Sequence, residues 1–414
     1  MKVKVVIGAN YGDEGKGLMT DYFVRQEKNP LVIRFNGGAQ AGHTINDGKI
    51  RHIFSHIGSG ALAGAPTFLS EHFVVNPLIF SKEREELINK GVVWNRYRHP
   101  KIFVDLDCRV TTPFDMLINQ KLEESRGDGR HGSVGIGFGE TIEQSERYED
   151  AFKFDYLYDT PDEIYGRLVD IEKNWYRPRL EELGLEEESW NNDFYEGVRK
   201  NFVNHAISMR NWVDGVLDME SIILEKNHTL IFEGAQGLLL DQDGKDFPHV
   251  TRSFTGLTNV DHLLRKNEIK VDDDSEVVYV SRAYMTRHGA GPLKEEVKDP
   301  GEIGFDVVDE TNKHGDYQGS LRFAPLYIDE LVDRIHDDAD KNGWLREISI
   351  AVTCVDQADD FVRYGSGGFK HTVARPMYLN LVKDFADYIS MGPTWRDVVE
   401  TRHIQKFNQM MKGG

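Results

Sequence analysis

The stretch VKVVIGANYGDEGKG, residues 3–17, runs from an apolar segment directly into a glycine-rich loop. Val3–Ile7 is rich in β-branched residues and predicts a buried strand, and a helix is predicted from near Leu18. A strand, a glycine-rich loop and a helix in this order present backbone N–H groups and a helix N-terminus to a phosphate group. The loop is not a Walker A motif, because Asn10 stands where that motif has its first glycine, and a glycine rather than serine or threonine follows Lys16.

A second apolar segment, Leu31–Phe35, also ends in a glycine-rich loop, NGGAQAGHT at residues 36–44. Further short apolar runs, each bounded by turn residues or by a helical pattern, occur at Ile102–Val104, Leu230–Phe232, Val277–Val280, Ile348–Val352 and Tyr388–Ile389. Strands that alternate with helices are typical of a mostly parallel sheet covered on both faces. The sequence therefore predicts an α/β fold, in which helices flank a central, mostly parallel sheet.

The segment 151–228 has a different, mainly helical pattern. Apolar residues at helical spacing predict one long amphipathic helix over about 193–224, and the charged stretch Glu163–Trp190 predicts further helix. No linker rich in proline, glycine or serine interrupts the chain, so we expect a single domain, 1–414, that carries a mainly helical insertion. The tail KFNQMMKGG, residues 406–414, is expected to fray.

The composition limits the kinds of protein that this chain can be. Its 414 residues include 50 Lys and Arg against 69 Asp and Glu, a formal charge of −19, and 11% are aromatic. This aromatic content is too high for a disordered chain, no run of about 18 apolar residues predicts a membrane span, and the polar start is unlike a signal peptide. Cys108 and Cys354 are too few for a disulfide framework or a zinc cluster. We expect a soluble cytoplasmic protein without membrane or nucleic-acid partners, because an acidic surface repels nucleic-acid phosphates.

Asp13 and Glu14 are unusual residues for a phosphate-binding loop, because a carboxylate repels a polyphosphate. They fit such a loop if a metal ion lies between carboxylate and phosphate, or if a carboxylate transfers a proton. Lys16 supplies a positive charge for the same anion. The alternative is an ordinary tight turn with solvated acids, but the crowding of Gly12 and Gly15 at one strand end favours a phosphate site.

The second loop places His43 beside Gly42 at the end of a predicted strand, which makes this histidine a candidate catalytic group. Six motifs then follow one another along the chain: GDEGKG at 12–17, AGHT at 41–44, EGAQG at 233–237, PHVT at 248–251, TRHGAGP at 286–292 and SMGP at 390–393. With these motifs the sequence resembles the adenylosuccinate synthetase family, from residue 8 to about 393. The stretch GAPTFLSEHFVVNP resembles its archaeal and viral members.

The resemblance implies the P-loop-like nucleotide-binding fold of this family and a ligase that joins L-aspartate to carbon 6 of a purine monophosphate. GTP would be hydrolysed through a 6-phosphoryl intermediate. Asp13 would remove the N1 proton of the purine, His43 would donate to the transferring phosphoryl group, and Gln236 would contact the base. Mg²⁺ would lie on Asp13 and the carbonyl of Gly42. Arg147 stands where family members bring an arginine from a partner subunit, so a homodimer is implied.

The same resemblance implies three binding sets. The triphosphate set is Gly12, Glu14, Gly15, Lys16, Gly17, Gly42, Thr44, Asp356, Ser390, Gly392 and Pro393. The purine-monophosphate set is Asn36, Gln40, Ser133, Val134, Arg147, Gln236 and Thr251. The aspartate set is Gly319, Ser320 and Arg322. Asp356 favours GTP over ATP, since a carboxylate accepts from guanine N1–H and its 2-amino group; ATP stays possible.

Two purine substrates fit the resemblance. IMP is the substrate of ordinary adenylosuccinate synthetases, and dGMP is the substrate of viral relatives that make a precursor of 2,6-diaminopurine deoxynucleotide. Ser320 replaces an arginine that in the family reaches toward the ribose 2′-hydroxyl, and Tyr317–Gln318 replaces two threonines. Asp13 favours IMP, because the viral relatives often lack this aspartate. The sequence favours dGMP as the substrate, and IMP is the alternative. If the chain is viral, the expected compartment is the host cytoplasm.

Other classes of protein fit the sequence less well. A non-catalytic nucleotide-binding regulator would need the first loop alone, whereas Asp13 and His43 together offer an acid–base pair. A dinucleotide oxidoreductase is disfavoured, because no G-x-G-x-x-G follows the first strand. His249, His288 and His371 match no metal-ligand spacing and are expected to line a pocket or to be structural.

Overall fold

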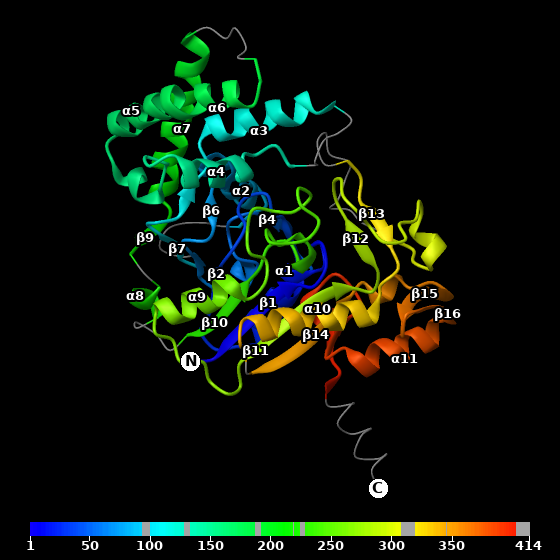
Figure 1. The fold of residues 1–414 in the computed structure, drawn as a ribbon. Coiled ribbons are helices and arrows are strands. Elements are labelled where there is room, and N and C mark those ends of the chain that lie inside the picture. The colour runs from blue at the N-terminus through cyan, green and yellow to red at the C-terminus, as the bar shows by residue number, and fades with distance from the viewer. Residues whose placement is uncertain are drawn as a thin grey trace.

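A computed structural model of the chain describes residues 1–92, 100–127, 133–186, 192–217, 219–223, 228–307, 319–344 and 346–402 (Figure 1). The Tyr317–Gln318 replacement and the tail at 406–414 lie outside the described residues, as does the end of the predicted helical stretch 163–190.

A ten-stranded sheet forms the centre of the molecule. Its spatial order is β18 (Val398–Glu400), β17 (Tyr388–Ser390), β14 (Glu347–Thr353), β11 (Glu276–Arg282), β1 (Val3–Gly8), β10 (Thr229–Glu233), β2 (Pro30–Arg34), β5 (Thr67–Leu69), β7 (Ile102–Asp105) and β9 (Asp214–Val216). Neighbouring strands pair in parallel, except that β18 is antiparallel to β17. The predicted α/β fold with a mostly parallel sheet is confirmed.

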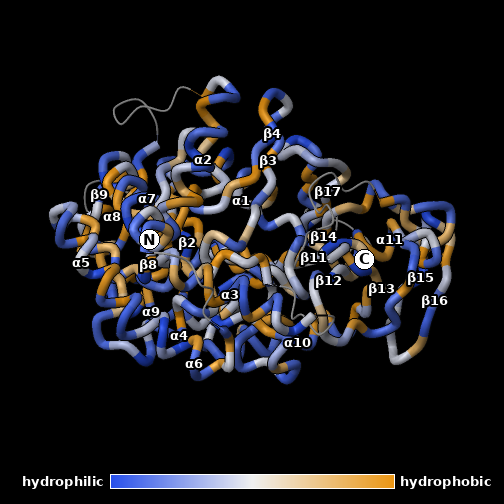
Figure 2. The backbone as a smooth tube through the Cα atoms, turned by 90° about the horizontal axis from the view of Figure 1, so that it is seen from above, coloured by the Kyte–Doolittle hydropathy of each residue, from blue (hydrophilic) through white to orange (hydrophobic). Residues whose placement is uncertain are grey.

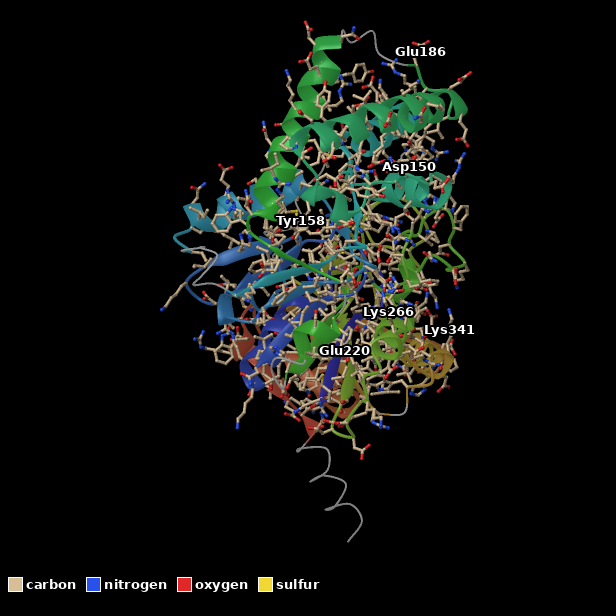
Figure 3. The ribbon with its side chains drawn as sticks, turned by 90° about the vertical axis from the view of Figure 1, so that its left-hand side faces the viewer. Asp150, Tyr158, Glu186, Glu220, Lys266 and Lys341 are labelled. Carbon is tan, nitrogen blue, oxygen red and sulfur yellow. The ribbon has the colours of Figure 1, made fainter. Side chains whose placement is uncertain are left out.

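The helices and small sheets surround this centre. The helices are α1 (Lys16–Gln26), α2 (Pro77–Asn89), α3 (Pro113–Ser125), α4 (Phe138–Arg147), α5 (Pro161–Ile171), α6 (Arg177–Glu182), α7 (Asn192–Arg210), α8 (Glu220–Ile223), α9 (Thr258–Lys266), α10 (Ile328–Lys341) and α11 (Arg375–Phe385). The paired short strands are β3 (His43–Asn46) with β4 (Arg51–Phe54), β6 (Val74–Val75) with β8 (Arg109–Val110), β12 (Met285–Arg287) with β13 (Arg322–Ala324), and β15 (Phe361–Ser366) with β16 (Phe369–Ala374). Figure 1 shows α3 to α7 gathered at one end of the molecule, and in Figure 3 Glu186 marks the far end of this helical part, away from Lys266. No helix in the described part of the chain is both long enough and apolar enough to cross a membrane.

Strand β1 shows why both faces of the sheet are covered. All six of its residues are buried. Val3, Val5 and Ile7 belong to a core cluster that includes residues of α9 and α10, whereas Val6 packs in another cluster with Met19 of α1. Successive side chains of a strand point to opposite faces, so a continuous apolar run fits a strand between two helical layers. Figure 2 shows hydrophobic positions along the central elements and hydrophilic ones along the outer turns.

Several helices begin with the same sequence signal, a polar capping residue followed by proline. Asn76 accepts hydrogen bonds from the first turn of α2. Thr112 with Asp115 and Thr160 with Glu163 form capping boxes at α3 and α5. The capping residue satisfies backbone donors that the helix leaves unpaired, and proline at the first helical position costs no hydrogen bond.

The predicted long helix over 193–224 is wrong. Helix α7 ends at Arg210, and Asp214–Val216 forms strand β9 at the edge of the sheet. The backbone of β9 gains hydrogen bonds there: Leu106 N donates to Val216 O at 2.9 Å, and Gly215 N donates to Tyr158 Oη at 2.8 Å. These backbone hydrogen bonds favour a strand here, although the spacing of the valines is also compatible with a helix. Helix α1 also begins earlier than predicted, at Lys16.

Candidate active site

The parallel strands bring distant motifs to one edge of the sheet. Six strands of the central sheet have their carboxyl ends at the same edge: β1, β2, β10, β11, β14 and β17. Motifs or candidate residues identified in the sequence follow these strand ends directly or within a few residues. In open α/β sheets ligands bind at this edge.

The first loop has a tightly fixed backbone. Gly12, Asp13 and Gly15 all have positive φ, of 97°, 56° and 90°. A Cβ on Gly15 would lie 2.9 Å from Cγ2 of Thr353, whose hydroxyl donates to the carbonyl of Glu14 at 2.8 Å. A side chain at Gly15 would therefore be strained and would collide with β14, which explains the glycine.

Glu14 and Lys16 are buried beside each other at the start of α1. Their charged atoms lie 3.9 Å apart, and Glu14 Oε1 accepts from the backbone N–H of Asn10 at 2.5 Å. Glu14 Oε2 has no hydrogen-bond partner among the described residues. Burial raises the pKa of Glu14 to about 7 and lowers that of Lys16. A buried lysine at a helix N-terminus, next to a carboxyl that protonates readily, suits an anionic ligand such as a triphosphate.

His43 lies in a buried network built on Glu233, at the end of β10. His43 Nδ1 lies 2.6 Å from Glu233 Oε1, Ser59 N donates to Oε2 at 3.0 Å, and Ser59 Oγ also bonds this carboxylate. Arg34 Nε lies 3.9 Å from Glu233 Oε2. Burial opposes ionisation of Glu233, but His43, Arg34 and Ser59 more than compensate and hold its pKa at about 2.

The network fixes which nitrogen of His43 carries a proton. An ionised carboxylate only accepts, so Nδ1 donates to Glu233. Nε2 is buried and lacks a hydrogen-bond partner within the described ranges. Burial lowers the pKa of His43, against the opposing effect of Glu233. The ring is therefore held by one nitrogen, and the other is left for a ligand, in the manner of a catalytic histidine oriented by a carboxylate.

Asp13 faces a histidine that the sequence analysis did not place in a catalytic role. His288 Nε2 lies 3.4 Å from Asp13 Oδ2, and Arg282 donates to the backbone carbonyl of Asp13. The Asp13 side chain is 32% exposed, so a ligand can reach it. The position of His288 in the TRHGAGP motif was the feature of the sequence that could have indicated a role in the site. The spacing between histidines gave no such indication.

Gln40 and Gln236 converge around Gly37. A Cβ on Gly37 would lie 3.2 Å from Gln236 Oε1 and 3.6 Å from Gln40 Nε2. Both amide atoms of Gln40 and the Oε1 of Gln236 are buried, and none has a hydrogen-bond partner in the part of the chain that the structure describes. Buried polar groups in native proteins are normally satisfied, so these amides indicate a polar ligand such as a purine.

The predicted purine-monophosphate residue Asn36 is hydrogen-bonded to the backbone of two other segments. Its Oδ1 accepts from Ala235 N at 2.7 Å, and its Nδ2 lies within hydrogen-bond distance of Ala235 O at 3.2 Å and Phe254 O at 3.0 Å. The side chain is fully buried. Asn36 thus ties the second loop to the EGAQG segment, and the backbone already uses its amide.

The other predicted purine-monophosphate residues contact segments of their own chain or face solvent. Ser133 bonds Asn119 of α3 at 3.0 Å, and Val134 is 41% exposed. Thr251 is held by its N–H to Leu240 O at 2.9 Å. Arg147, at the exposed end of α4, pairs with acidic residues of its own chain, and these pairs raise its pKa.

The predicted aspartate-binding residue Arg322 lies on β13 with its guanidinium engaged. Its Nη1 donates to the carbonyls of Gly289 and Gly291, both at 2.9 Å, and its Nε donates to Glu296 Oε1 at 2.9 Å. Gly319 and Ser320 precede it, and Ser320 is exposed. Arg322 is thus fixed against the TRHGAGP segment, and Glu296 occupies the side that a substrate carboxylate would need.

The predicted guanine-reading residues lie on neighbouring strand ends. Val352 of β14 pairs with Ile389 of β17, so the turn that holds Asp356 and the turn 390–393 lie at the same edge. Ser390 Oγ donates to Gly392 O at 2.7 Å, and a Cβ on Gly392 would lie 2.8 Å from Asp397. Asp356 is exposed to solvent, but the surrounding protein removes part of the hydration of its carboxyl and thereby raises its pKa. The two turns are compatible with two walls of one base-binding site.

Comparisons with known proteins find one family. A family model described as adenylosuccinate synthetase matches residues 5–323. The adenylosuccinate synthetase of Neisseria meningitidis serogroup B is 30% identical over 324 residues, which cover 77% of this chain and 70% of that protein. That of Syntrophotalea carbinolica is 29% identical over 321 residues, covering 77% of this chain and 70% of that protein.

Two solved structures share the fold. The fully ligated adenylosuccinate synthetase from Plasmodium falciparum gives a TM-score of 0.73 at 17% identity, covering 97% of this chain and 100% of that one. The succinoaminodeoxyadenylate synthetase of cyanophage S-2L, bound to dGMP and to dATP as an energy donor, gives 0.62 at 16% identity, covering 97% and 95%.

Proposed function

The chain belongs to the adenylosuccinate synthetase family of C–N bond-forming ligases, and from this premise we propose that it joins L-aspartate to carbon 6 of dGMP with hydrolysis of GTP. The product would be N6-succino-2-amino-2′-deoxyadenylate. The observation that supports dGMP is the pair of buried amides, Gln40 and Gln236, whose acceptor oxygens lack partners among the described residues. Guanine offers a 2-amino donor that hypoxanthine lacks, and an unsatisfied buried acceptor costs about 1–3 kcal/mol.

The sugar side of the proposal rests on Ser320. Its exposed side chain stands where the resemblance expects an arginine that reaches toward the ribose 2′-hydroxyl. A serine is too short to make that contact, so this position gives the site no reason to prefer a ribonucleotide over a deoxyribonucleotide. The likeness in fold to a phage enzyme that binds dGMP points in the same direction. IMP is the second candidate, because the bacterial relatives are named adenylosuccinate synthetases.

In the first step of the proposed reaction, Asp13 removes the N1 proton, and the electron pair moves onto O6. O6 then attacks the γ-phosphorus of GTP, and GDP leaves. His43 Nε2 contacts the transferring phosphoryl group, and Lys16 holds the phosphates. The negative charge of the phosphates favours protonation of His43, whose Nδ1 is already bound to Glu233. In the second step the neutral amino group of aspartate attacks C6, the C6–O6 bond breaks, and inorganic phosphate leaves with O6. The new C–N nitrogen loses one proton to the departing phosphate.

The residues present fit a magnesium ion. Asp13 offers a carboxylate that is 32% exposed, and Gly42 offers the carbonyl of an exposed residue. Oxygen donors of this kind suit Mg²⁺, which usually keeps several waters and binds through one or two carboxylates together with substrate phosphates. When bound, the ion would neutralise charge on the phosphates.

The proposal includes a homodimer in which Arg147 reaches the partner's purine-monophosphate site. Arg147 is 44% exposed and pairs with Glu143 and Glu182 at 2.9 and 3.0 Å. Exposed ion pairs contribute little to stability because solvent screens them, so Arg147 can exchange these partners for a phosphate at small cost.

The function is tested by phosphate release with Mg²⁺, GTP and L-aspartate, comparing dGMP with IMP, and by the mass of the product. We expect faster turnover of dGMP. Faster turnover of IMP would identify an ordinary adenylosuccinate synthetase. Absence of phosphate release with both purines would leave a nucleotide-binding regulator as the remaining class.

Asp356→Asn should raise the KM for GTP by about 10–100-fold and reduce the preference for GTP over ATP. The substitution replaces a charged acceptor for guanine N1–H and the 2-amino group, and such bonds contribute about 1.5–3 kcal/mol. Steady-state kinetics with each triphosphate measure the change. Asp359→Asn, at an exposed acid in the same segment, serves as control. An unchanged GTP-to-ATP ratio in the Asp356 variant would remove this residue from base recognition.

Arg322→Ala should raise the KM for L-aspartate by about 10–100-fold and leave the KM for the purine within a few-fold. The lost contact is a charge-assisted hydrogen bond to the substrate carboxylate. Glu296→Gln is the informative companion, because it frees Arg322 of a competing carboxylate and should lower the KM for aspartate. An equal rise for both substrates in Arg322→Ala would place Arg322 outside the aspartate site.

A further inference from the structure

A second group of ligand-type side chains lies outside the candidate active site. Glu71, His72 and His262, here called the His–His–Glu cluster, bring two ring nitrogens and one carboxylate oxygen within 4.8 Å of one another. His72 Nε2 lies 2.9 Å from His262 Nδ1, and His262 Nδ1 lies 3.8 Å from Glu71 Oε1. None of these residues has a role in the reaction proposed above.

The cluster joins two segments that are distant in the sequence. Glu71 and His72 lie between β5 and β6, and His262 lies in the middle of α9. Lys266, one turn further along α9, also reaches Glu71, at 2.8 Å. Figure 3 labels Lys266, the last residue of α9. His262 is 52% exposed, so an ion from solvent can reach the cluster.

We propose that the His–His–Glu cluster binds a divalent transition-metal ion of the Zn²⁺ class. Two imidazoles and one carboxylate suit Zn²⁺, Co²⁺ or Ni²⁺, whereas Mg²⁺ and Ca²⁺ prefer oxygen ligands alone. Zn–N bonds of about 2.0–2.1 Å in tetrahedral geometry place two nitrogens about 3.3 Å apart. The observed 2.9 Å separation reaches this value with a small rotation of the exposed His262 ring. Water would complete the coordination.

The charges around the cluster act in both directions. Asp105 and Asp107 add negative charge near Lys266, and Asp105 also interacts with Glu71. Arg109 and Lys266 add positive charge near His72. Lys266 competes with a metal ion for the Glu71 carboxylate. Replacing Lys266 with methionine should therefore tighten metal binding, which separates a metal site from a simple hydrogen bond between two histidines.

Both segments of the cluster also hold the loop that carries Gln40 and His43. Val74 N, two residues after His72, donates to Gly37 O at 2.8 Å. Asn259, on α9 near His262, donates to Phe35 O at 3.1 Å. A bound ion would link these two supports. An effect of the metal ion on turnover would depend on the proposed ligase function. The binding of the metal ion to the cluster does not depend on that function.

The test uses the full chain without nucleotides, in millimolar Mg²⁺ to occupy oxygen-ligand sites. CoCl₂ is titrated while the visible absorption of tetrahedral Co²⁺ is recorded, and ZnCl₂ is then added as competitor. We expect one equivalent of Co²⁺ that Zn²⁺ displaces, and a rise of a few degrees in the Tm with Zn²⁺. His262→Ala and Glu71→Gln should weaken binding at least tenfold, and Lys266→Met should tighten it.

His336→Ala, at an exposed histidine of α10, is the matched control and should leave binding unchanged. Because His262 is largely exposed, its variant is expected to fold, and circular dichroism checks this. The proposal is overturned if Co²⁺ gives no tetrahedral spectrum, or if His262→Ala and His336→Ala weaken binding equally. These outcomes need no purine or aspartate, so they are distinguishable from a failure of the proposed ligase activity.

Discussion

Asp13→Asn should lower kcat by about 10²–10⁴-fold, the usual contribution of a positioned general base. Asparagine keeps the size of the side chain but cannot accept the N1 proton of the purine. Asn also tolerates the positive φ of 56° that the loop imposes at this position. Steady-state phosphate release with dGMP and with IMP measures the loss.

The fold should survive this substitution. The Asp13 side chain is 32% exposed, and its only ion-pair distance within the described residues is 3.4 Å, to His288. We therefore expect a free energy of unfolding within about 1 kcal/mol of the original protein. Asp243→Asn, which removes an exposed carboxylate elsewhere, is the charge-matched control. A near-normal kcat in Asp13→Asn, with either purine, would exclude Asp13 as the base.

The sequence predicts the central strands well, because those buried on both faces form continuous apolar runs. β1, β10 and β11 all lie where such runs predict them. The edge strand β9 escapes prediction, since its three residues become a strand only through pairing with β7. A local pattern of valines cannot carry that information.

Long-range partners in the site escape prediction for a similar reason. His43 and Glu233 are 190 residues apart, and their contact depends on β10 lying between β1 and β2. The same holds for His288 beside Asp13 and for Glu296 on Arg322. The motifs indicate which residues bear chemistry, whereas strand order decides which of them meet.

Glu233→Gln should have the largest effect on stability, a loss of about 3–5 kcal/mol, because it removes one partner of a buried charge network. Arg34 is fully buried, and its guanidinium atoms have no hydrogen-bond partner among the described residues. With Glu233 neutralised, the Arg34 charge loses its nearest compensating group at 3.9 Å. The amide would also turn donors toward the N–H and hydroxyl of Ser59, both of which now donate. Urea unfolding at neutral pH measures the loss.

The destabilisation caused by Glu233→Gln should depend on pH in a defined direction. The pKa of Glu233 is lowered from an ordinary value of 4.5 to about 2. Its contribution to stability is therefore complete above pH 4.5 and is lost as the pH falls toward 2. The difference in free energy of unfolding between the original protein and Glu233→Gln should narrow over that window. A difference that stays constant with pH would mean that Glu233 is not ionised in the folded protein.

Activity separates the catalytic consequence of Glu233→Gln from the structural one. Without the carboxylate, His43 loses the acceptor that fixes Nδ1 as its donor, so kcat should fall by about 10²–10⁴-fold among the molecules that remain folded. Glu276→Gln is the matched control, since Glu276 is buried and pairs with Lys4 at 2.7 Å on the neighbouring strand β1. It should lose stability but retain kcat. If both variants retain kcat equally, Glu233 has only a structural role. The orientation of His43 would then depend on the rest of the fold and not on the Glu233 carboxylate.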